Sequence, residues 1–312
     1  MHLYLGMKKK SRASGAIWLL LFSLTGWLHG CQSLDAQTAA QEPALEGRLW
    51  SVAQQDFVEK AHFLASLPPN TWLLIGEQHD HPEHQQWALR WVEELAAQER
   101  LGAVAFEMAH HQQQAALDRA LGQAQITPEA LEWLAAWPWD RYQSVVEASL
   151  RLAPRVLGAD LTRAEQLAAY REGAPQTALS SAQAEVLDQL IDEGHCQLLP
   201  QERLPQMRQV QLARDQQMAL ILSTTPLNEG IGVFLAGSVH QRPDLGVPRW
   251  LADGVQSVTV RLVALDERAT PDAYLQPGVD GRVTADYLLW TSPLPAADYC
   301  AELRAQFQSG HQ

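Results

Sequence analysis

The chain has 312 residues, of which 46% are hydrophobic, and its formal net charge at pH 7 is −13. The first 30 residues hold four of the 23 Lys and Arg and none of the 36 Asp and Glu. The remainder, with 19 basic and 36 acidic residues, has a net charge of −17 and is repelled by phosphate backbones. This charge argues against nucleic acid as a partner. Because no low-complexity linker divides the chain, one domain is expected.

Residues 1–30 have the pattern of a bacterial lipoprotein signal, with basic residues at 8–12 and an apolar stretch at 16–28 before Cys31. The apolar stretch is shorter than the roughly 20 residues that span a bilayer, so cleavage is expected, with a lipid on Cys31. Gln32 stands where an aspartate usually retains such proteins in the inner membrane. We therefore expect a cell-envelope protein held at the outer membrane by its lipid alone; an ordinary signal peptide or an uncleaved anchor are the alternatives.

The pattern after this segment predicts an α/β fold, with a central, mostly parallel sheet flanked by helices. Polar residues 31–48 are expected to form a flexible tether, and 49–312 a single domain. Strands are predicted at 72–76, 103–107, 155–160, 232–237 and 257–265, and a late edge strand at 286–290. Helices are predicted after Pro82, at 109–121, after Thr127–Pro128 and after the aromatic loop WPWDRY. A helical insertion at about 162–225, with segments at 162–172, 181–193 and 203–223, separates two strands.

The most informative motif is Gly-x-x-His, which twice follows an apolar run, in WLLIGEQH ending at His79 and in GVFLAGSVH ending at His240. The glycine is expected to let the backbone turn sharply after the strand. Two more apolar runs end at Glu107 and Asp160. Because the carboxyl ends of parallel strands share one edge of a sheet, we expect Glu77 and these four side chains to meet there.

Glu77, His79, Glu107 and His240 offer nitrogen and oxygen ligands that suit a divalent metal such as Zn²⁺ or Mn²⁺, with a position left for a reactive water. Without metal, the carboxylates are suited to work as a general acid and base. A third interpretation is structural: the carboxylates cap loop amides and the histidines bond buried backbone.

The chain keeps two cysteines once Cys31 is assigned to lipidation, namely Cys196 and Cys300. In an oxidising compartment two such thiols often pair, which would tie the chain's tail to its middle. Two independently buried cysteines are the alternative.

Several motifs together resemble the ChaN-type haem-binding lipoproteins, which belong to a larger group with the Tiki proteases and erythromycin-esterase-like proteins. The resemblance runs in consistent order from about Thr71 to Val263. It implies an α/β domain with a helical subdomain, tethered to the outer membrane, that takes part in haem-iron acquisition. It also implies haem held by tyrosine at a dimer interface, with histidine assisting. The motifs are IGEQHDHPEHQQ, FEM at 106–108, WPWDRYQSVVEAS, QVQLARDQQMA and LAGSVHQRPDLGVPRWL.

Carried over to this chain, the resemblance makes Tyr142 the first candidate for the axial ligand of ferric haem and Tyr170 the second. The alternative for Tyr142 is an interface or core tyrosine whose hydroxyl is hydrogen-bonded. His81 and His84 are candidates for a metal or a haem propionate, although a helix cap explains them equally well. Arg214 is a candidate for anchoring a propionate. The expected partners are haem, a second copy of the chain and an outer-membrane haem receptor or transporter.

Two functions from different classes therefore compete. Haem binding is the preferred hypothesis, because the family resemblance and the lipid anchor both favour it. The alternative is a Tiki-like metal-dependent hydrolase of peptides or esters that uses Glu77, His79, Glu107 and His240. Whether the chain is an enzyme stays open at this point.

Overall fold

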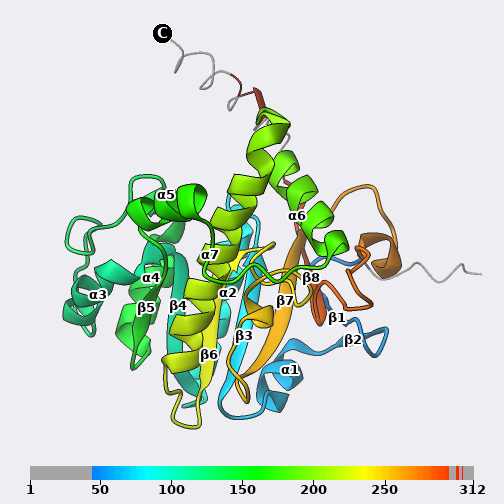
Figure 1. Ribbon diagram of the computed structural model, residues 1–312. Coiled ribbons are helices and arrows are strands. Elements are labelled where there is room, and N and C mark those ends of the chain that lie inside the picture. The colour runs from blue at the N-terminus through cyan, green and yellow to red at the C-terminus, as the bar shows by residue number, and fades with distance from the viewer. Residues whose placement is uncertain (1–43, 295–299, 302–303, 305–312) are drawn as a thin grey trace, which may run out of the picture. The chain divides into compact units, whose positions relative to one another are not determined.

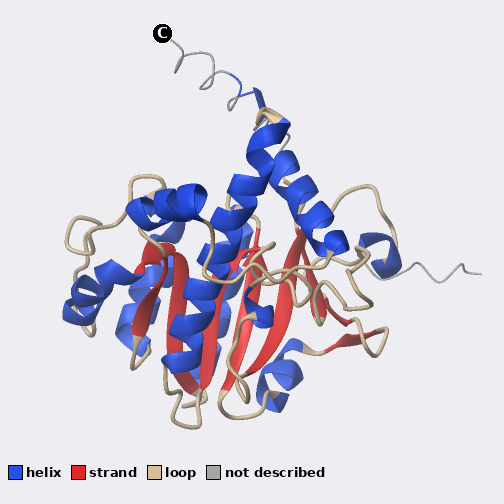
Figure 2. Ribbon diagram, in the orientation of Figure 1, coloured by secondary structure: helices blue, strands red, loops and turns tan. Residues whose placement is uncertain are grey.

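The computed structural model describes residues 44–294, 300–301 and 304, and these belong to one unit that starts at Ala44. The signal at 1–30 and the lipidation at Cys31 lie outside the described residues. An eight-stranded sheet has the order β2-β1-β8-β7-β3-β6-β4-β5 (Figures 1 and 2). The predicted α/β class is confirmed. The strands are β1 Leu49–Ser51, β2 Asp56–Val58, β3 Thr71–Glu77, β4 Leu101–His110, β5 Val156–Asp160, β6 Ile231–Gly237, β7 Gln256–Ala264 and β8 Tyr287–Thr291.

Six neighbouring strands, from β8 to β5, run parallel, whereas β1 pairs antiparallel with both β2 and β8. β3 lies at the centre between β6 and β7, and all seven of its residues are buried. The late strand at 286–290 was predicted at an edge, which is wrong. β8 lies between β7 and β1, because the short hairpin at the start of the domain pairs with it.

Helices cover both faces of the sheet (Figures 1 and 2). α7 packs on one face through Met218, Ala219 and Leu222, and α2 and α4 pack on the other. No helix among the described residues is long and apolar enough to cross a membrane. The helices are α1 Lys60–Ser66, α2 Pro82–Ala97, α3 Gln114–Ala120, α4 Trp139–Leu152, α5 Arg163–Glu172, α6 Ser181–Gly194 and α7 Leu204–Thr224.

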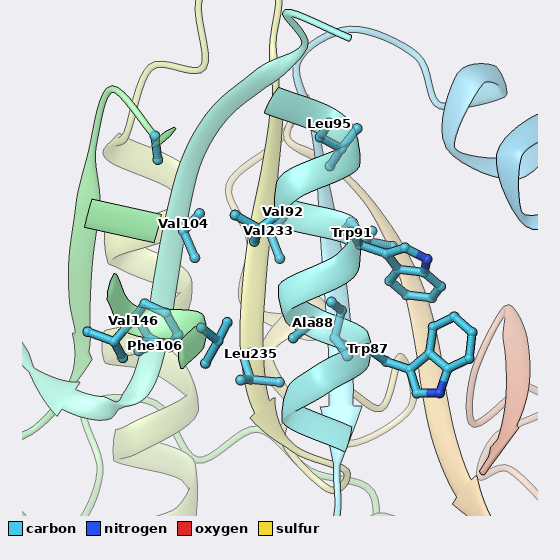
Figure 3. Close-up of a cluster of buried hydrophobic side chains, with 14 of the residues drawn as sticks. Trp87, Ala88, Trp91, Val92, Leu95, Val104, Phe106, Val146, Val233 and Leu235 are labelled. Carbon is cyan, nitrogen blue, oxygen red and sulfur yellow. The ribbon is translucent and has the colours of Figure 1, made fainter. Parts of the chain in front are cut away.

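The helix after β3 forms as its sequence predicts. Pro82 occupies the start of α2, where a missing backbone N–H costs nothing, and His81 precedes it as the N-cap. Ala88, Trp91, Val92 and Leu95 face the sheet and are buried, and Figure 3 shows them beside Val233 and Leu235 of β6 and Val104 and Phe106 of β4. Burying a large apolar side chain contributes about 1.5–3 kcal/mol, so this contact holds α2 against the strands whose ends carry the polar motifs.

Three local predictions differ from the structure. Residues 127–137 form turns and no helix: Glu132 has a positive φ of 54°, and the Trp133 N–H bonds back to Pro128 O, which stops helical propagation. β4 continues past Glu107 to His110, with a register shift against β5. The tether was predicted to reach residue 48, but the packed domain begins before that position: Leu45 is buried, and the Gly47 N–H bonds to Trp290 O.

The helical insertion between β5 and β6 has the predicted three segments, α5, α6 and α7. Capping boxes at Thr162 and Ser180 begin α5 and α6, since each side chain accepts a backbone N–H that the helix cannot satisfy. A disulfide joins Cys196, just after α6, to Cys300, so the predicted pairing is confirmed.

Removing this disulfide by a Cys196→Ser and Cys300→Ser double substitution should lower the free energy of unfolding by about 2–4 kcal/mol, because the bond restrains a loop of 104 residues in the unfolded chain. Urea denaturation with and without reductant measures the effect. The wild type should lose this stability on reduction, whereas the double variant should not respond to the reductant. Equal stability of both proteins under oxidising conditions would contradict the expectation.

Candidate functional site

The side chains that were predicted at the strand ends meet at the carboxyl edge of the sheet. His79 Nδ1 lies 2.7 Å from Glu77 Oε1, and His79 Nε2 lies 3.7 Å from Glu107 Oε2. His240 Nε2 lies 3.3 Å from Glu107 Oε1. Glu107 therefore connects the two Gly-x-x-His segments. Three of these side chains are almost fully buried, whereas the side chain of His79 is 33% exposed.

Glu107 is held on several sides. Arg214 Nη2 donates to Glu107 Oε1 at 2.6 Å, and the backbone N–H of Gly237 donates to Oε2 at 2.6 Å. The same guanidinium also bonds both oxygens of Asp160, at 2.7–3.1 Å. The fifth residue predicted for the edge thus joins the cluster through Arg214 of α7.

Both carboxylate oxygens of Glu77 also accept hydrogen bonds. Tyr142 donates its hydroxyl to Glu77 Oε1 at 2.8 Å, and the side-chain amide of Gln85 donates to Oε2 at 2.5 Å. His79 shares Oε1 and stacks near Trp137, with ring centroids 4.7 Å apart. Glu77 thus fixes the His79 ring through Nδ1, while Nε2 faces the buried carboxylate of Glu107.

Neither motif glycine serves as a turn, because neither Gly76 nor Gly237 has a positive φ. Both lie inside strands, where the absence of a side chain lets neighbouring side chains come close to the backbone. A Cβ on Gly237 would lie 2.8 Å from His79 Nε2, and a Cβ on Gly76 would overlap the Gln241 side chain. The predicted role of the glycine as a turn is therefore wrong. Its role is to let the His79 ring and the 237–241 segment pack against the sheet.

Burial and neighbouring charges shift the pKa values of these groups in opposite directions. Burial lowers the pKa of His240, but the Glu107 and Asp215 carboxylates outweigh it and raise the pKa to about 9. Burial also lowers the pKa of His79, and Glu107 and Glu77 reverse that shift, so it is raised. Burial raises the pKa of Glu107, but His240, His79 and Arg214 bring it well below its usual value. Both imidazoles are therefore favoured in the protonated form, beside the ionised carboxylate of Glu107.

The predicted metal would find few free ligand atoms in this cluster. Within the described ranges, no group of three or more His, Cys, Asp and Glu side chains is placed to hold one metal ion. The lone pairs of Glu77 and Glu107 that a metal would need accept hydrogen bonds from Tyr142, Gln85, Arg214 and the Gly237 N–H. These acceptor atoms are thus engaged within the protein, and the metal site stays a prediction.

Most of the haem candidates are also engaged internally. Tyr142 lies in the first turn of α4 and not in a loop; it is fully buried, and burial together with Glu77 raises the pKa of its phenol. His81 caps α2 and its Nε2 bonds Ser292 O, while His84 accepts from the Gln78 N–H and bonds Thr291 Oγ1. Both imidazoles are buried, unlike the solvated cap that the sequence suggested.

Tyr170 stands apart from these. It lies in α5, is half-buried, and forms no hydrogen bond with the described part of the chain. α5 directly follows the carboxyl end of β5 and packs against α7, so Tyr170 lies near the edge where the cluster sits. One turn earlier in the same helix, Gln166 bonds Asp160 Oδ2 at 3.4 Å, and residues four apart share a helix side.

Sequence reasoning missed two contributors. Gln85 bonds Glu77, and Gln211 Nε2 lies 3.0 Å from His240 Nδ1, which donates to Asp215 Oδ1 at 2.6 Å. The spacing of Gln211, Arg214 and Asp215 in α7 was a usable signal, because positions three and four apart face one way on a helix. No comparable signal pointed to Gln85 before the packing of α2 was known.

Fold and site together define an α/β protein with a buried network of acidic and basic side chains at the carboxyl edge of its sheet. The family described as "Haem-binding uptake, Tiki superfamily, ChaN" matches residues 63–251, which is more than half of the chain. The chain belongs to this family.

One solved structure supports the fold. The structure "Cofacial heme binding to ChaN of Campylobacter jejuni" is similar with a TM-score of 0.64 and 23% identity, covering 77% of this chain and 95% of that one. An erythromycin esterase mutant in its open conformation is similar with a TM-score of 0.42 and 12% identity, covering 76% of this chain and 79% of that one. No curated protein matches the chain.

The raised pKa of His240 predicts that stability depends on pH. Because the pKa is about 9 in the folded state and 6.5 in the unfolded state, the protonated ring stabilises the fold fully below pH 6.5. This contribution, on the order of 3 kcal/mol, is lost as the pH rises from about 6.5 to 9. Urea denaturation across this range should show the loss in the wild type.

The matched variant is His240→Asn, which keeps a polar side chain but cannot titrate. It should be less stable than the wild type at pH 6.5 and show a smaller dependence on pH, with the remainder due to His79. An equally steep pH dependence in His240→Asn would contradict this assignment.

Proposed function

We propose that the protein binds haem and serves in bacterial haem or iron acquisition. The observation that carries this proposal is the family match over residues 63–251. The similar Campylobacter jejuni protein, which binds haem cofacially, supports the same ligand. The haem iron of proteins in general accepts a tyrosine phenolate as an axial ligand, so the chain's tyrosines decide where the site lies.

Among the two candidate tyrosines, accessibility favours Tyr170. Tyr142 is fully buried and its hydroxyl donates to Glu77, so binding iron would require breaking that bond and moving α4. Tyr170 is half-buried and needs no such change. The raised pKa of the Tyr142 phenol also opposes the phenolate form, because burial and Glu77 both disfavour a second negative charge.

A surface suited to a porphyrin lies beside Tyr170. A groove of about 510 Å³ between α5 and α7 begins at Leu161, directly after the carboxyl end of β5. Ala169 of α5 lines this groove, and so does Leu220, which is 56% exposed; Tyr170 follows Ala169 in α5 but does not itself line the groove. A porphyrin needs apolar walls of this kind, since most of a ligand's surface is buried in a binding site. We propose that haem binds in this groove and that the Tyr170 side chain, which does not line the groove, turns toward the iron when haem binds.

The remaining parts of the proposal concern location and partners. The signal pattern before Cys31 supports a lipid anchor, which we propose holds the domain at the outer membrane. A second copy of the chain is the proposed partner in the haem complex, and the cofacial haem binding of the Campylobacter jejuni protein supports this choice. Exchange of haem with an outer-membrane receptor or transporter would complete the role.

Titration of the purified protein with ferric haem, followed by the Soret absorption, tests the ligand. The wild type should bind, and Tyr170→Phe should shift the band and weaken binding by about tenfold or more, because the phenolate bond to iron is lost. Tyr287→Phe, a half-buried tyrosine on β8, serves as the control and should bind as the wild type does. Loss of the band in Tyr142→Phe with Tyr170→Phe unaffected would contradict the assignment.

The groove is tested separately by Leu220→Glu, which places a charge on its wall. Because Leu220 is exposed, the fold should tolerate this change, while the affinity for haem should fall about tenfold. Leu152→Glu is the matched control: Leu152 is 37% exposed at the end of α4, on the other face of the sheet. If both variants lost affinity equally, or if neither lost affinity, the groove would not be the haem site.

Hydrolysis is the second candidate, and one observation favours it. Glu77 bonds Nδ1 of the partly exposed His79 ring, and the raised pKa of this ring favours the imidazolium form, which suits a general acid. Ester turnover that is lost in Glu77→Gln would establish it, and the absence of turnover in the wild type would exclude it for the esters assayed.

A further inference from the structure

A second pocket, of about 500 Å³, lies beside the cluster at the carboxyl ends of β3, β6 and β7. Gln78 and Ser238, which directly follow Glu77 and Gly237, line one side of it. Its most distinctive feature is three arginines, Arg242, Arg261 and Arg268, in a chain whose formal net charge is −13. This pocket shares no lining residue with the groove between α5 and α7.

Two of these arginines already have carboxylate partners. Arg242 bonds both oxygens of the buried Asp244, at 2.8 and 2.5 Å, and Asp244 also accepts the Val279 N–H. Arg268 bonds both oxygens of Asp266. Each nearby acid is therefore satisfied by its own arginine, and neither is left to neutralise a third cation.

Arg261 lacks such a partner. Its side chain projects from the interior strand β7 and is 9% exposed. Nη2 makes one long bond, 3.4 Å, to the Tyr274 carbonyl oxygen, and the buried Nη1 bonds no described atom. No carboxylate of the described residues lies within ion-pair distance of this guanidinium. A buried cation without a counter-charge is costly, so this position points to an anion that comes from outside the chain.

The electrostatic surroundings agree with that conclusion. Burial, followed by the charges of Arg242 and Arg268, lowers the pKa of Arg261 to about 10, so the group stays charged at neutral pH at a cost to the fold. An incoming carboxylate would offset both the desolvation and the repulsion. Guanidinium groups bind carboxylates through two parallel hydrogen bonds, and Nη1 supplies an unused donor.

We propose that this pocket binds a small organic anion through its carboxylate, with Arg261 as the binding residue. Leu190, Val263 and Leu265 line the same pocket and provide an apolar wall for the body of the ligand. The carboxylate comes either from a haem propionate or from a separate small carboxylate. The proposal does not depend on haem binding, because the unpaired guanidinium and the pocket exist in the chain alone.

Isothermal titration of the purified protein with hexanoate, a carboxylate with an apolar tail, tests the site. Hexanamide, its neutral counterpart, should bind far more weakly. Arg261→Met, which keeps the side-chain length but removes the charge, should weaken hexanoate binding by about tenfold or more, since hydrogen bonds to charged groups are lost. Arg151→Met, an exposed arginine at the end of α4, is the control and should bind hexanoate as the wild type does.

Thermal unfolding without added anion gives an independent readout that does not need the ligand. Arg261→Met should melt at the same or a higher temperature than the wild type, because an unpaired buried charge is removed. Hexanoate should raise the melting temperature of the wild type but not that of Arg261→Met. A clear fall in the melting temperature of Arg261→Met would show that Arg261 is paired within the fold and would overturn the proposal.

Competition identifies the source of the carboxylate. Displacement of hexanoate by ferric haem, but not by its dimethyl ester, would assign the pocket to a propionate. Failure of ferric haem to compete would assign it to a separate small carboxylate. Both outcomes support the pocket as an anion site. Equal affinity of the wild type for hexanoate and hexanamide, or unchanged binding in Arg261→Met, would overturn it.

Discussion

The buried carboxylate of Glu107 is the point on which the carboxyl edge of this fold depends. It accepts hydrogen bonds from Arg214 of α7 and from the Gly237 N–H of β6, and it forms an ion pair with the His240 ring. Removing it would take away one of the two carboxylates that each of Arg214 and His240 contacts, leaving Asp160 and Asp215 as their remaining partners, and breaking buried ion pairs is destabilising. The helical insertion and the sheet are thus joined by charge as well as by apolar packing.

Residues typical of a catalytic or metal site are present at this edge, but they bond to one another and to their neighbours in the fold. The carboxylates face arginine, tyrosine and amide donors, and their lone pairs are used within the protein. Only the His79 ring is placed so that solvent reaches it. A ligand is therefore more readily accommodated beside the network than inside it, in the groove between α5 and α7 or in the arginine-lined pocket at the end of β7.

Much of the architecture could be predicted from local patterns. Apolar runs indicated the five central parallel strands, helical periodicity indicated α2 and the three helices of the insertion, and the strand ends indicated Glu77, Glu107, His79 and His240. These features follow from nearest-neighbour chemistry along the chain. The disulfide was suggested by cysteine number and compartment, with independent burial as its alternative, and the structure decides between the two.

The features that could not be predicted depend on contacts between distant segments. The position of β8 inside the sheet depends on the hairpin of β1 and β2, more than 200 residues earlier in the chain. The burial of Tyr142 depends on how α4 packs against α2. The missing partner of Arg261 is visible only when the surrounding carboxylates are assigned to other cations.

The central claim is that the network at the sheet edge is structural and that haem binds beside it, through Tyr170. A crystal structure of the protein saturated with ferric haem tests this most directly. The account predicts the porphyrin in the groove between α5 and α7, the iron bonded to Tyr170 Oη, and the Glu77–Tyr142 hydrogen bond intact. Iron bonded to Tyr142, with that hydrogen bond broken, would contradict it.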